Sequence, residues 1–502
     1  MQNEIQEKIK AELDKIKRKY LDSADEIFSD FNKEEQTAGD YNGRQIYELL
    51  QNAEDVAEGF GEVLIEFKQN KFSISNTGAP FDFDGVVSLL RSNNSSKKFS
   101  SNTIGQKGLG FRSVLAWAEK VRVITTSFAL EFSKEIANEV LQDLHRQKPE
   151  FAANKKAQNI AILPCPKLTN QSAKSPYATT IEIVCKESVL EDIKKQILSL
   201  DMLELLFLSK LRCVRICTEE FDKTFEKREI GKNEFEIKEF DNLTETEISN
   251  SKWHLFEERG EIEVEGDDGG LVVKNYELKI AYDFANQTRG THLYSYFKTK
   301  IKFDFPCLIH ATFDLTSNRD GIVKSDTNRK LVKKLADFIA DTAVKISKMQ
   351  NKCNYEPLKL VLGVGDDLYG YDFPLREIAK QKKLFPTIAG EYVVCDEDVC
   401  FSHLKFGEVL NPETFGDLLQ YTQDEAILGY IEHIFYDYEY FKEKLNEDIV
   451  QNAYSLEQKC ELIRLVKQNQ KFYDEYTGEC LNLLVDEDGN VANGLIFERV
   501  QN

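Results

Sequence analysis

The chain has 502 residues, of which 41% are hydrophobic and 30% charged, and its formal net charge is -21 at pH 7. This length suffices for about three domains of ordinary size. The acidic balance disfavours broad electrostatic binding to a nucleic-acid backbone, so nucleic acid is not an expected partner. No apolar run approaches the roughly 20 residues that cross a bilayer, and the start MQNEIQEKIK lacks a signal peptide's apolar core. We therefore expect a cytoplasmic protein without a membrane segment.

The 10 cysteines are scattered and form no C-x-x-C pair. The closest pairs are Cys213 with Cys217 and Cys395 with Cys400, and neither has a second pair or histidines at zinc-ligand spacing. Reduced thiols in the core are therefore favoured over a metal site.

The first segments of the chain alternate between helix and strand patterns. Residues 1 to about 30 carry apolar side chains at helical spacing and predict an amphipathic helix. After glycine and asparagine breaks, residues 45–57 again show helical periodicity. Residues 63–67 and 71–75 alternate like the two strands of a β-hairpin.

A second group of patterns follows this hairpin. The turn NTGAP precedes a predicted helix at 83–90 and a polar segment at 91–103. The glycine-rich run GQKGLGFRS then leads into a helical pattern at 113–119. The order of helices and strands predicts an α/β layered domain.

The stretch ELLQNAED, residues 48–55, places polar groups on a helix that otherwise needs apolar ones. Glu48, Asn52 and Asp55 are spaced i, i+4 and i+7, so they lie within about 60° of one another on the helix. A carboxamide can complete a Mg²⁺ site while a carboxylate one turn away orients or deprotonates water. The alternative for this octapeptide is a solvated helix face.

Two further stretches fit the same chemistry. Asn76 begins NTGAPF after a strand, and Gly78 would let the backbone approach a flat ligand closely. The glycine-rich run offers backbone N–H groups before a helical pattern, an arrangement that binds phosphate, although such a run can also be a simple turn. Lys107 adds a positive charge there.

Together these motifs resemble the GHKL ATPases, which include gyrase, heat shock protein 90, mismatch-repair ATPases and histidine kinases. ELLQNAED matches the N-box of that superfamily, ISNTGAPFD is similar to its adenine-binding box, and TIGQKGLGFRSV is similar to its second glycine box. The sequence most resembles the sacsin-like and heat-shock-chaperone-like branch, whose members have a similar SSK before IGQKGLGFRSV.

The resemblance implies a role for each matching residue. Glu48 would be the general base for the attacking water, Asn52 the Mg²⁺ ligand and Asp55 a polar contact near the nucleotide. Residues 91–107 would form the ATP lid. The residues expected to contact nucleotide in the lid and glycine box are Lys97, Gly105, Gln106, Lys107, Gly108, Leu109, Gly110 and Phe111.

The adenine side of the expected site contains one departure from the family pattern. The family usually has aspartate where this chain has Asn76, whose carbonyl oxygen can still accept a hydrogen bond from the adenine amino group. Thr179, in ATTIEI, resembles the family threonine that helps hold adenine, and Thr180 is the second candidate for this role. An ordinary strand threonine is the alternative for Thr179.

The resemblance continues beyond the nucleotide domain. Residues 205–216, 294–300 and 305–322 are similar to the middle segment of sacsin-like proteins, and a helical pattern follows at 328–350. In the heat-shock chaperone, a Ser-Arg-Glu at the matching place directs its arginine to the γ-phosphate, so the resemblance implies this role for Arg319 in SNRD. A planar guanidinium suits the role, because it clamps phosphate oxygens. A surface pair of Arg319 with Asp320 is the alternative.

The implied fold class is α+β. A Bergerat-type two-layer α/β sandwich would be followed by a transducer-like α/β middle domain and a mixed α/β C-terminal region. The expected divisions are an N-terminal helix at 1–35, the ATP-binding domain at 36–205, the middle domain at 206–350 and the C-terminal region at 351–502.

The expected function is Mg-dependent ATP binding and hydrolysis. Closure of the lid and of the domains would act on a protein partner or client, and the expected partners include a second copy of the chain. Bacterial sacsin-like ATPases often belong to larger systems, including phage defence, and the chain could be part of a longer protein. The alternatives are a nucleotide-gated scaffold with little turnover and a DNA-processing ATPase of topoisomerase or mismatch-repair type. A histidine kinase is excluded because the first histidine, His145, lies after the N-box. His310 is expected to be a packed or surface histidine.

Overall fold

The computed structural model describes most of the chain up to residue 468. The described residues are 2–40, 43–91, 110–266, 269–316, 321–365, 368, 371–396, 399–402, 405–406, 409–431, 438–452 and 454–468. They form a mixed α+β protein with one large mixed sheet. Across this part of the chain, no helix combines the length and the apolar character needed to cross a membrane.

The chain divides into two compact units. The first comprises Met1–Thr288, His292–Lys302 and Leu308–Asn328, and the second comprises Arg289–Thr291, Phe303–Cys307 and Arg329–Asn502. The finer division into four parts that the sequence suggests stays a prediction.

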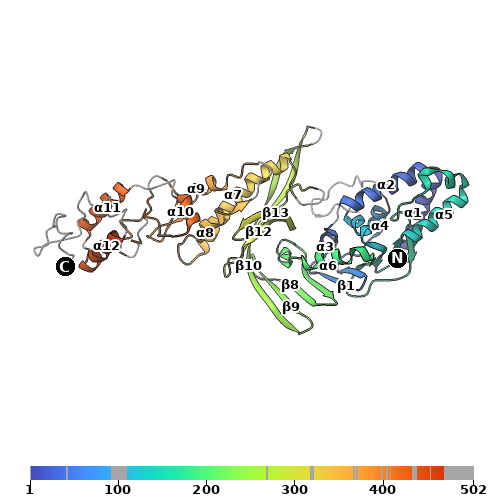
Figure 1. Ribbon diagram of the computed structural model, residues 1–502, viewed down its shortest axis with the longest axis horizontal. Coiled ribbons are helices and arrows are strands. Elements are labelled where there is room, and N and C mark those ends of the chain that lie inside the picture. Colours follow the sequence, from blue (N-terminus) through green and yellow to red (C-terminus); the bar gives the residue numbers. More distant parts are fainter. Residues whose placement is uncertain are drawn as a thin grey trace, which may run out of the picture. The chain divides into compact units, whose positions relative to one another are not determined.

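The first unit contains six α-helices within its described residues. They are α1 (Gln2–Asp22), α2 (Ala24–Asp40), α3 (Gln45–Val56), α4 (Phe83–Leu90), α5 (Lys134–Gln147) and α6 (Leu190–Leu198). Short 3-10 helices are η1 (Gly110–Ala116), η2 (Pro149–Ala153), η3 (Lys155–Ala157), η4 (Glu187–Val189) and η5 (Met202–Leu206). Helix α1 contacts α2, α4 and α5 at the N-terminal end of the chain (Figure 1).

The single N-terminal helix expected from the sequence is two helices. They are separated at Ser23, whose hydroxyl accepts the backbone N–H of Asp25 at 3.2 Å. Serine competes for backbone hydrogen bonds in this way and favours helix starts over helix interiors.

The strands of this unit form one sheet. The first seven are β1 (Gly61–Lys68), β2 (Lys71–Asn76), β3 (Ala118–Thr125), β4 (Ala129–Ser133), β5 (Lys167–Thr169), β6 (Thr179–Cys185) and β7 (Leu211–Thr218). The others are β8 (Asp222–Gly231), β9 (Glu234–Asp241), β10 (Thr246–Glu265), β11 (Leu271–Tyr282), β12 (Gly290–Ser295), β13 (Phe297–Phe305) and β14 (Leu308–Ala311). β12 and β13 each have residues in both units.

The strand order among these strands is β13-β12-β14-β11-β10-β9-β8-β7-β1-β2-β6-β3-β4-β5. The pairs β1–β7 and β12–β14 are parallel, and the other pairs described are antiparallel. Figure 1 shows β8 and β9 side by side as a long hairpin. The parallel pairing of β1 with β7 joins the sheet of the N-terminal half to the strands that follow.

Local sequence explains the elements nearest the candidate site. The predicted hairpin is confirmed as β1 and β2, which pair up to Lys68 and Lys71 around Gln69, a residue with a positive φ of 55°. Alternate residues of β1 are buried, as its alternating pattern requires. The predicted helix at 83–90 is confirmed as α4, and the Asp82 carboxylate caps it by accepting the N–H of Gly85 at 2.7 Å.

One predicted helix is wrong. Residues 110–116 form the 3-10 helix η1, and strand β3 begins at Ala118, where the sequence pattern indicated a helix at 113–119. Within this segment Val114 and Trp117 are fully buried, and Trp117 packs edge-on against Phe72 of β2. Packing of these apolar side chains against the sheet outweighs the local helical preference.

The second unit contains most of α7 (Asp326–Met349), which confirms the helix expected at 328–350. Its remaining elements are α8 (Glu356–Val361), β15 (Val364–Gly365), α9 (Leu375–Lys380), β16 (Phe385–Pro386), β17 (Tyr392–Val393), α10 (Glu425–Ile431), α11 (Tyr438–Gln451) and α12 (Leu456–Gln468). A small apolar cluster that includes Phe406, Phe415 and Leu445 forms its C-terminal core.

Candidate functional site

Helix α3 carries the polar face expected from ELLQNAED. The Glu48 side chain is only 7% exposed, while Asn52 and Asp55 are half-buried. A solvated helix face would leave all three exposed, so their burial disfavours that alternative for this stretch. The polar face of α3 is therefore at least half-buried.

The C-terminal end of α3 meets the turn that follows β2. The N–H of Ala79 donates to the carbonyl of Val56 at 2.9 Å. Gly78 has φ +102°, and a Cβ at this position would lie 2.4 Å from the same carbonyl oxygen. Only glycine allows this approach, so the turn NTGAP is fixed directly against the helix end.

Asn76 and Thr179 bring a third segment to the same place. They face each other in the antiparallel pair of β2 and β6, and paired residues share a face of the sheet. The Thr179 hydroxyl accepts the N–H of Phe81 at 3.1 Å, which ties β6 to the turn after β2. The Asn76 Nδ2 donates to the Thr77 carbonyl at 2.9 Å, so Oδ1 is the acceptor end of this amide.

Thr180, the second candidate for the adenine contact, lies on the opposite face of β6. Its hydroxyl is 2.9 Å from the hydroxyl of Ser75. Consecutive strand residues point to opposite faces, so only Thr179 shares a face with Asn76.

Several predicted site residues lie outside the described part of the chain. These are Lys97, Gly105, Gln106, Lys107, Gly108, Leu109 and Arg319. The backbone of Gly110 and Phe111 begins η1. The roles expected for all of these residues remain predictions.

Gln51, on the polar side of α3, shows an unusual environment. Its side chain is 1% exposed, and neither amide atom has a hydrogen-bond partner in the described part of the protein. It follows Glu48 by three residues and precedes Asp55 by four, so all three lie close together on the helix surface. Buried amides are almost always paired, so an unpaired one beside Glu48 calls for an explanation.

Glu54 is a residue that the sequence interpretation missed. The residue is 3% exposed, and its carboxylate accepts backbone N–H groups from three consecutive residues: Ser209 at 2.8 Å, Lys210 at 2.9 Å and Leu211 at 2.7 Å. The only available signal was a charged residue on the otherwise apolar side of α3. Its partners are too far along the chain for any local pattern to identify.

The segment that Glu54 holds, residues 202–211, is called here the connector. It consists of η5 and the residues leading into β7. Two buried lysines bind its carbonyls: Lys227 Nζ donates to Leu205 at 2.8 Å and Leu208 at 2.6 Å, and Lys279 Nζ donates to Phe207 at 3.1 Å. Burial lowers the pKa of Lys227, whereas its carbonyl acceptors favour the ammonium form.

His310, on β14, packs beneath the connector. It is fully buried and stacks on the ring of Phe207 at 5.4 Å. Its Nδ1 accepts the N–H of Tyr296 at 2.9 Å, so a proton on Nδ1 would break that bond. Burial lowers the pKa of His310 to about 4, and the residue is packed, as one of the two sequence alternatives held.

The connector itself carries a second buried carboxyl. Glu204, in η5, accepts the N–H of Lys298 at 2.8 Å, and burial raises its pKa to about 8. Arg44, just before α3, donates to the carbonyl of Lys298 at 3.2 Å. Both ends of α3 are thus tied to connector residues or to β13.

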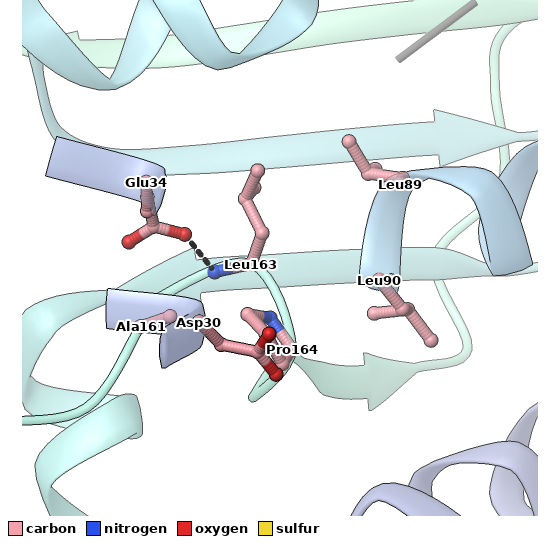
Figure 2. Close-up of a pocket in the computed structure, with 7 residues that line it drawn as sticks. All are labelled: Asp30, Glu34, Leu89, Leu90, Ala161, Leu163 and Pro164. Atoms are coloured by element: carbon pink, nitrogen blue, oxygen red, sulfur yellow. Dashed lines mark hydrogen bonds between the residues drawn. The ribbon is translucent and has the colours of Figure 1, made fainter. Parts of the chain in front are cut away.

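A shallow pocket lies elsewhere, between α2, the end of α4 and residues 161–164. Figure 2 shows Glu34 directed at this loop, and its carboxylate accepts the N–H groups of Ile162 at 2.7 Å and Leu163 at 2.9 Å. These contacts fix the loop, and the pocket contains none of the predicted site residues. We therefore interpret the Glu34 contacts as holding the loop in place and not as part of the candidate site.

Neither similarity to known proteins nor a cluster of metal-ligating side chains in the described residues identifies a function. No family model matches the chain, and no curated protein matches it significantly. Among the described residues, no group of three or more His, Cys, Asp and Glu side chains could hold a metal ion.

Proposed function

We propose that the chain is a Mg-dependent ATP-binding protein and ATPase of the GHKL class, most similar to its sacsin-like and heat-shock-chaperone-like branch. The fold of the N-terminal half would be of the Bergerat type. One observation carries this proposal: three motifs that are separate in the sequence meet at the C-terminal end of α3. They are ELLQNAED, the NTGAPF turn and Thr179.

The polar groups of these three motifs suit a nucleotide with its metal. The Asn76 Oδ1 can accept from an adenine amino group, and the Thr179 hydroxyl can donate its proton to a ring nitrogen or a bridging water. Asn52 would supply one oxygen to Mg²⁺, which usually retains several waters and takes its other ligands from phosphates. When bound, the metal would neutralise developing charge on the phosphates.

The residues of this chain would divide the remaining work. Glu48 would orient and deprotonate the attacking water. Its buried position would keep bulk solvent away from its carboxylate. Asp55 would hold polar groups near the nucleotide. The unpaired amide of Gln51 fits a site whose polar groups gain partners only when it is occupied.

The output of such an ATPase is conformational. Closure of the segment at 91–107 and contact of Arg319 with the γ-phosphate would couple nucleotide state to a protein partner or client. Purified protein tests the proposal through phosphate release from ATP with and without Mg²⁺. Magnesium-dependent release supports it, whereas bound nucleotide with negligible release supports the scaffold alternative. Absence of nucleotide binding rejects both.

A further inference from the structure

The face of α3 opposite Asn52 is attached to the connector. Four short contacts from Glu54 oxygens reach the N–H groups of residues 209–211, between 2.7 and 3.2 Å. Hydrogen bonds to a carboxylate are about twice as strong as neutral ones, and burial removes competing water. Lys210 adds a bond from its Nζ to the carbonyl of Asp55 at 2.9 Å.

The connector is equally fixed on its other side. Lys227 belongs to β8 and Lys279 to β11, and both are almost fully buried. Between them they bind the carbonyls of four consecutive connector residues, 205 to 208. The ring of Phe207 also packs on Tyr294 and His310, which belong to β12 and β14.

These contacts form one continuous chain of bonds from α3 to the strands beyond β7. The N–H groups of residues 209–211 bind α3, while the carbonyls of residues 205–208 bind β8 and β11. Residues 205–208 and 209–211 follow each other directly, so no unbonded residue lies between the two sets that could absorb a movement. A shift of α3 therefore strains the bonds to Lys227 and Lys279 unless the strands follow it.

We propose that Glu54 is a positioning residue, whose carboxylate fixes the Glu48-bearing helix to the connector and so transmits occupancy of the site to β8 and β11. This inference rests on the proposed function and adds a route that runs through the back of α3, independent of Arg319. Glu54 does not touch the reacting atoms. It acts by holding α3 at one position relative to the sheet.

The test compares two carboxylates, one in the last turn of α3 and one just beyond its end. Glu54→Gln keeps the size of the side chain, but it removes the negative charge and one of the two acceptor oxygens. Glu58→Gln is the matched control, because Glu58 is exposed just beyond α3 and the substitution makes the same chemical change. Glu54→Asp is a second variant, which keeps the negative charge but shortens the side chain by one methylene group, so its carboxylate cannot reach the same set of N–H groups.

Three measurements are made on the full chain: Mg-ATP affinity by calorimetry, kcat with KM, and amide hydrogen exchange over β8 and β11 with and without Mg-ATP. For Glu54→Gln we expect kcat to fall about tenfold with KM changed less than about twofold, because misplacing a catalytic group lowers turnover more than binding. The nucleotide-dependent change in exchange over β8 and β11 should be lost. Glu58→Gln should match the wild type in all three measurements.

A Glu54→Gln protein with wild-type kcat and a wild-type exchange response would overturn the inference and leave the proposed function intact. Wild-type protein that binds no nucleotide would overturn both. If Glu54→Gln does not fold, Glu54→Asp decides: a fall in kcat of at least about threefold with a weakened exchange response supports the inference, and wild-type behaviour overturns it.

Discussion

Asn76 and Thr179 lie directly opposite each other in β2 and β6, and the Thr179 hydroxyl also accepts the N–H of Phe81. One threonine thereby connects a late strand to both ends of the turn that presses against α3. The candidate adenine contacts are held by sheet pairing, whereas the candidate catalytic face is held by a helix. The contact of Gly78 with Val56 fixes these two parts together.

Asn52→Ala should weaken Mg-ATP binding about tenfold, which corresponds to about 1.4 kcal/mol, because one oxygen ligand of the metal is lost. Calorimetry should show this loss with Mg²⁺ and a much smaller one in the presence of a chelator. Asn275→Ala, at an exposed position of β11, is the control and should bind normally. An equal loss with and without Mg²⁺ would contradict the metal-ligand role.

Gly78→Ala should lower the free energy of unfolding by about 2–4 kcal/mol, because the new Cβ would clash with the Val56 carbonyl oxygen at a strained positive φ. Gly59→Ala is a control for strain alone, since Gly59 has φ +64° and a Cβ there would meet no atom within 4 Å. It should cost about 1 kcal/mol. Equal losses in urea denaturation would show that the contact with α3 is unimportant.

Gln51→Met should raise the free energy of unfolding by about 1 kcal/mol, because a buried amide without partners is replaced by an apolar side chain of similar length. Gln45→Met on the same helix should instead lower it by about 1–3 kcal/mol. The Gln45 Oε1 accepts from Gly43 and Gln196, so this change removes real bonds. Urea denaturation distinguishes the two, and a destabilised Gln51→Met protein would refute the interpretation of Gln51.

The stability of the first unit should depend on pH through His310. Its folded pKa is about 4, against 6.5 for an ordinary histidine, so between these values the unfolded chain binds a proton that the folded chain does not. Stability must therefore fall as the pH falls from 6.5 towards 4, with a slope of up to about 1.4 kcal/mol per pH unit. The groups facing His310 are Glu277 and Lys279 on β11, with the N–H of Tyr296 on Nδ1.

His310→Gln tests this dependence, because glutamine can still accept the Tyr296 N–H but does not titrate. Denaturation midpoints measured from pH 7 to 4.5 should decline less steeply than in the wild type. An unchanged slope would assign the acid sensitivity to other groups.

Local sequence patterns were sufficient to predict the helices and strands that depend mainly on neighbouring residues. The β1–β2 hairpin, α3, α4 and α7 all follow from periodicity and turn residues. The choice of Thr179 came from family resemblance, and only the alternation of β6 shows which threonine shares a face with Asn76. The helix expected at 113–119 failed because burial of Trp117 against the sheet decides that segment.

The connection behind α3 could not be predicted from the sequence. Glu54 finds its partners 155 to 157 residues away, and nothing in the segment SKL at 209–211 indicates that its backbone needs an anion. Lys227 and Lys279 likewise resemble exposed strand lysines until the sheet buries them. Such contacts depend on tertiary arrangement, which a single sequence does not specify locally.

The most direct test of the central claim is ATP hydrolysis by the wild type and Glu48→Ala, with nucleotide affinity measured in parallel. The account predicts Mg-dependent phosphate release by the wild type, a fall of at least about a hundredfold in Glu48→Ala, and Mg-ATP affinity within about twofold, because a general base acts on water and not on the bound nucleotide. Hydrolysis at the wild-type rate in Glu48→Ala would contradict the account.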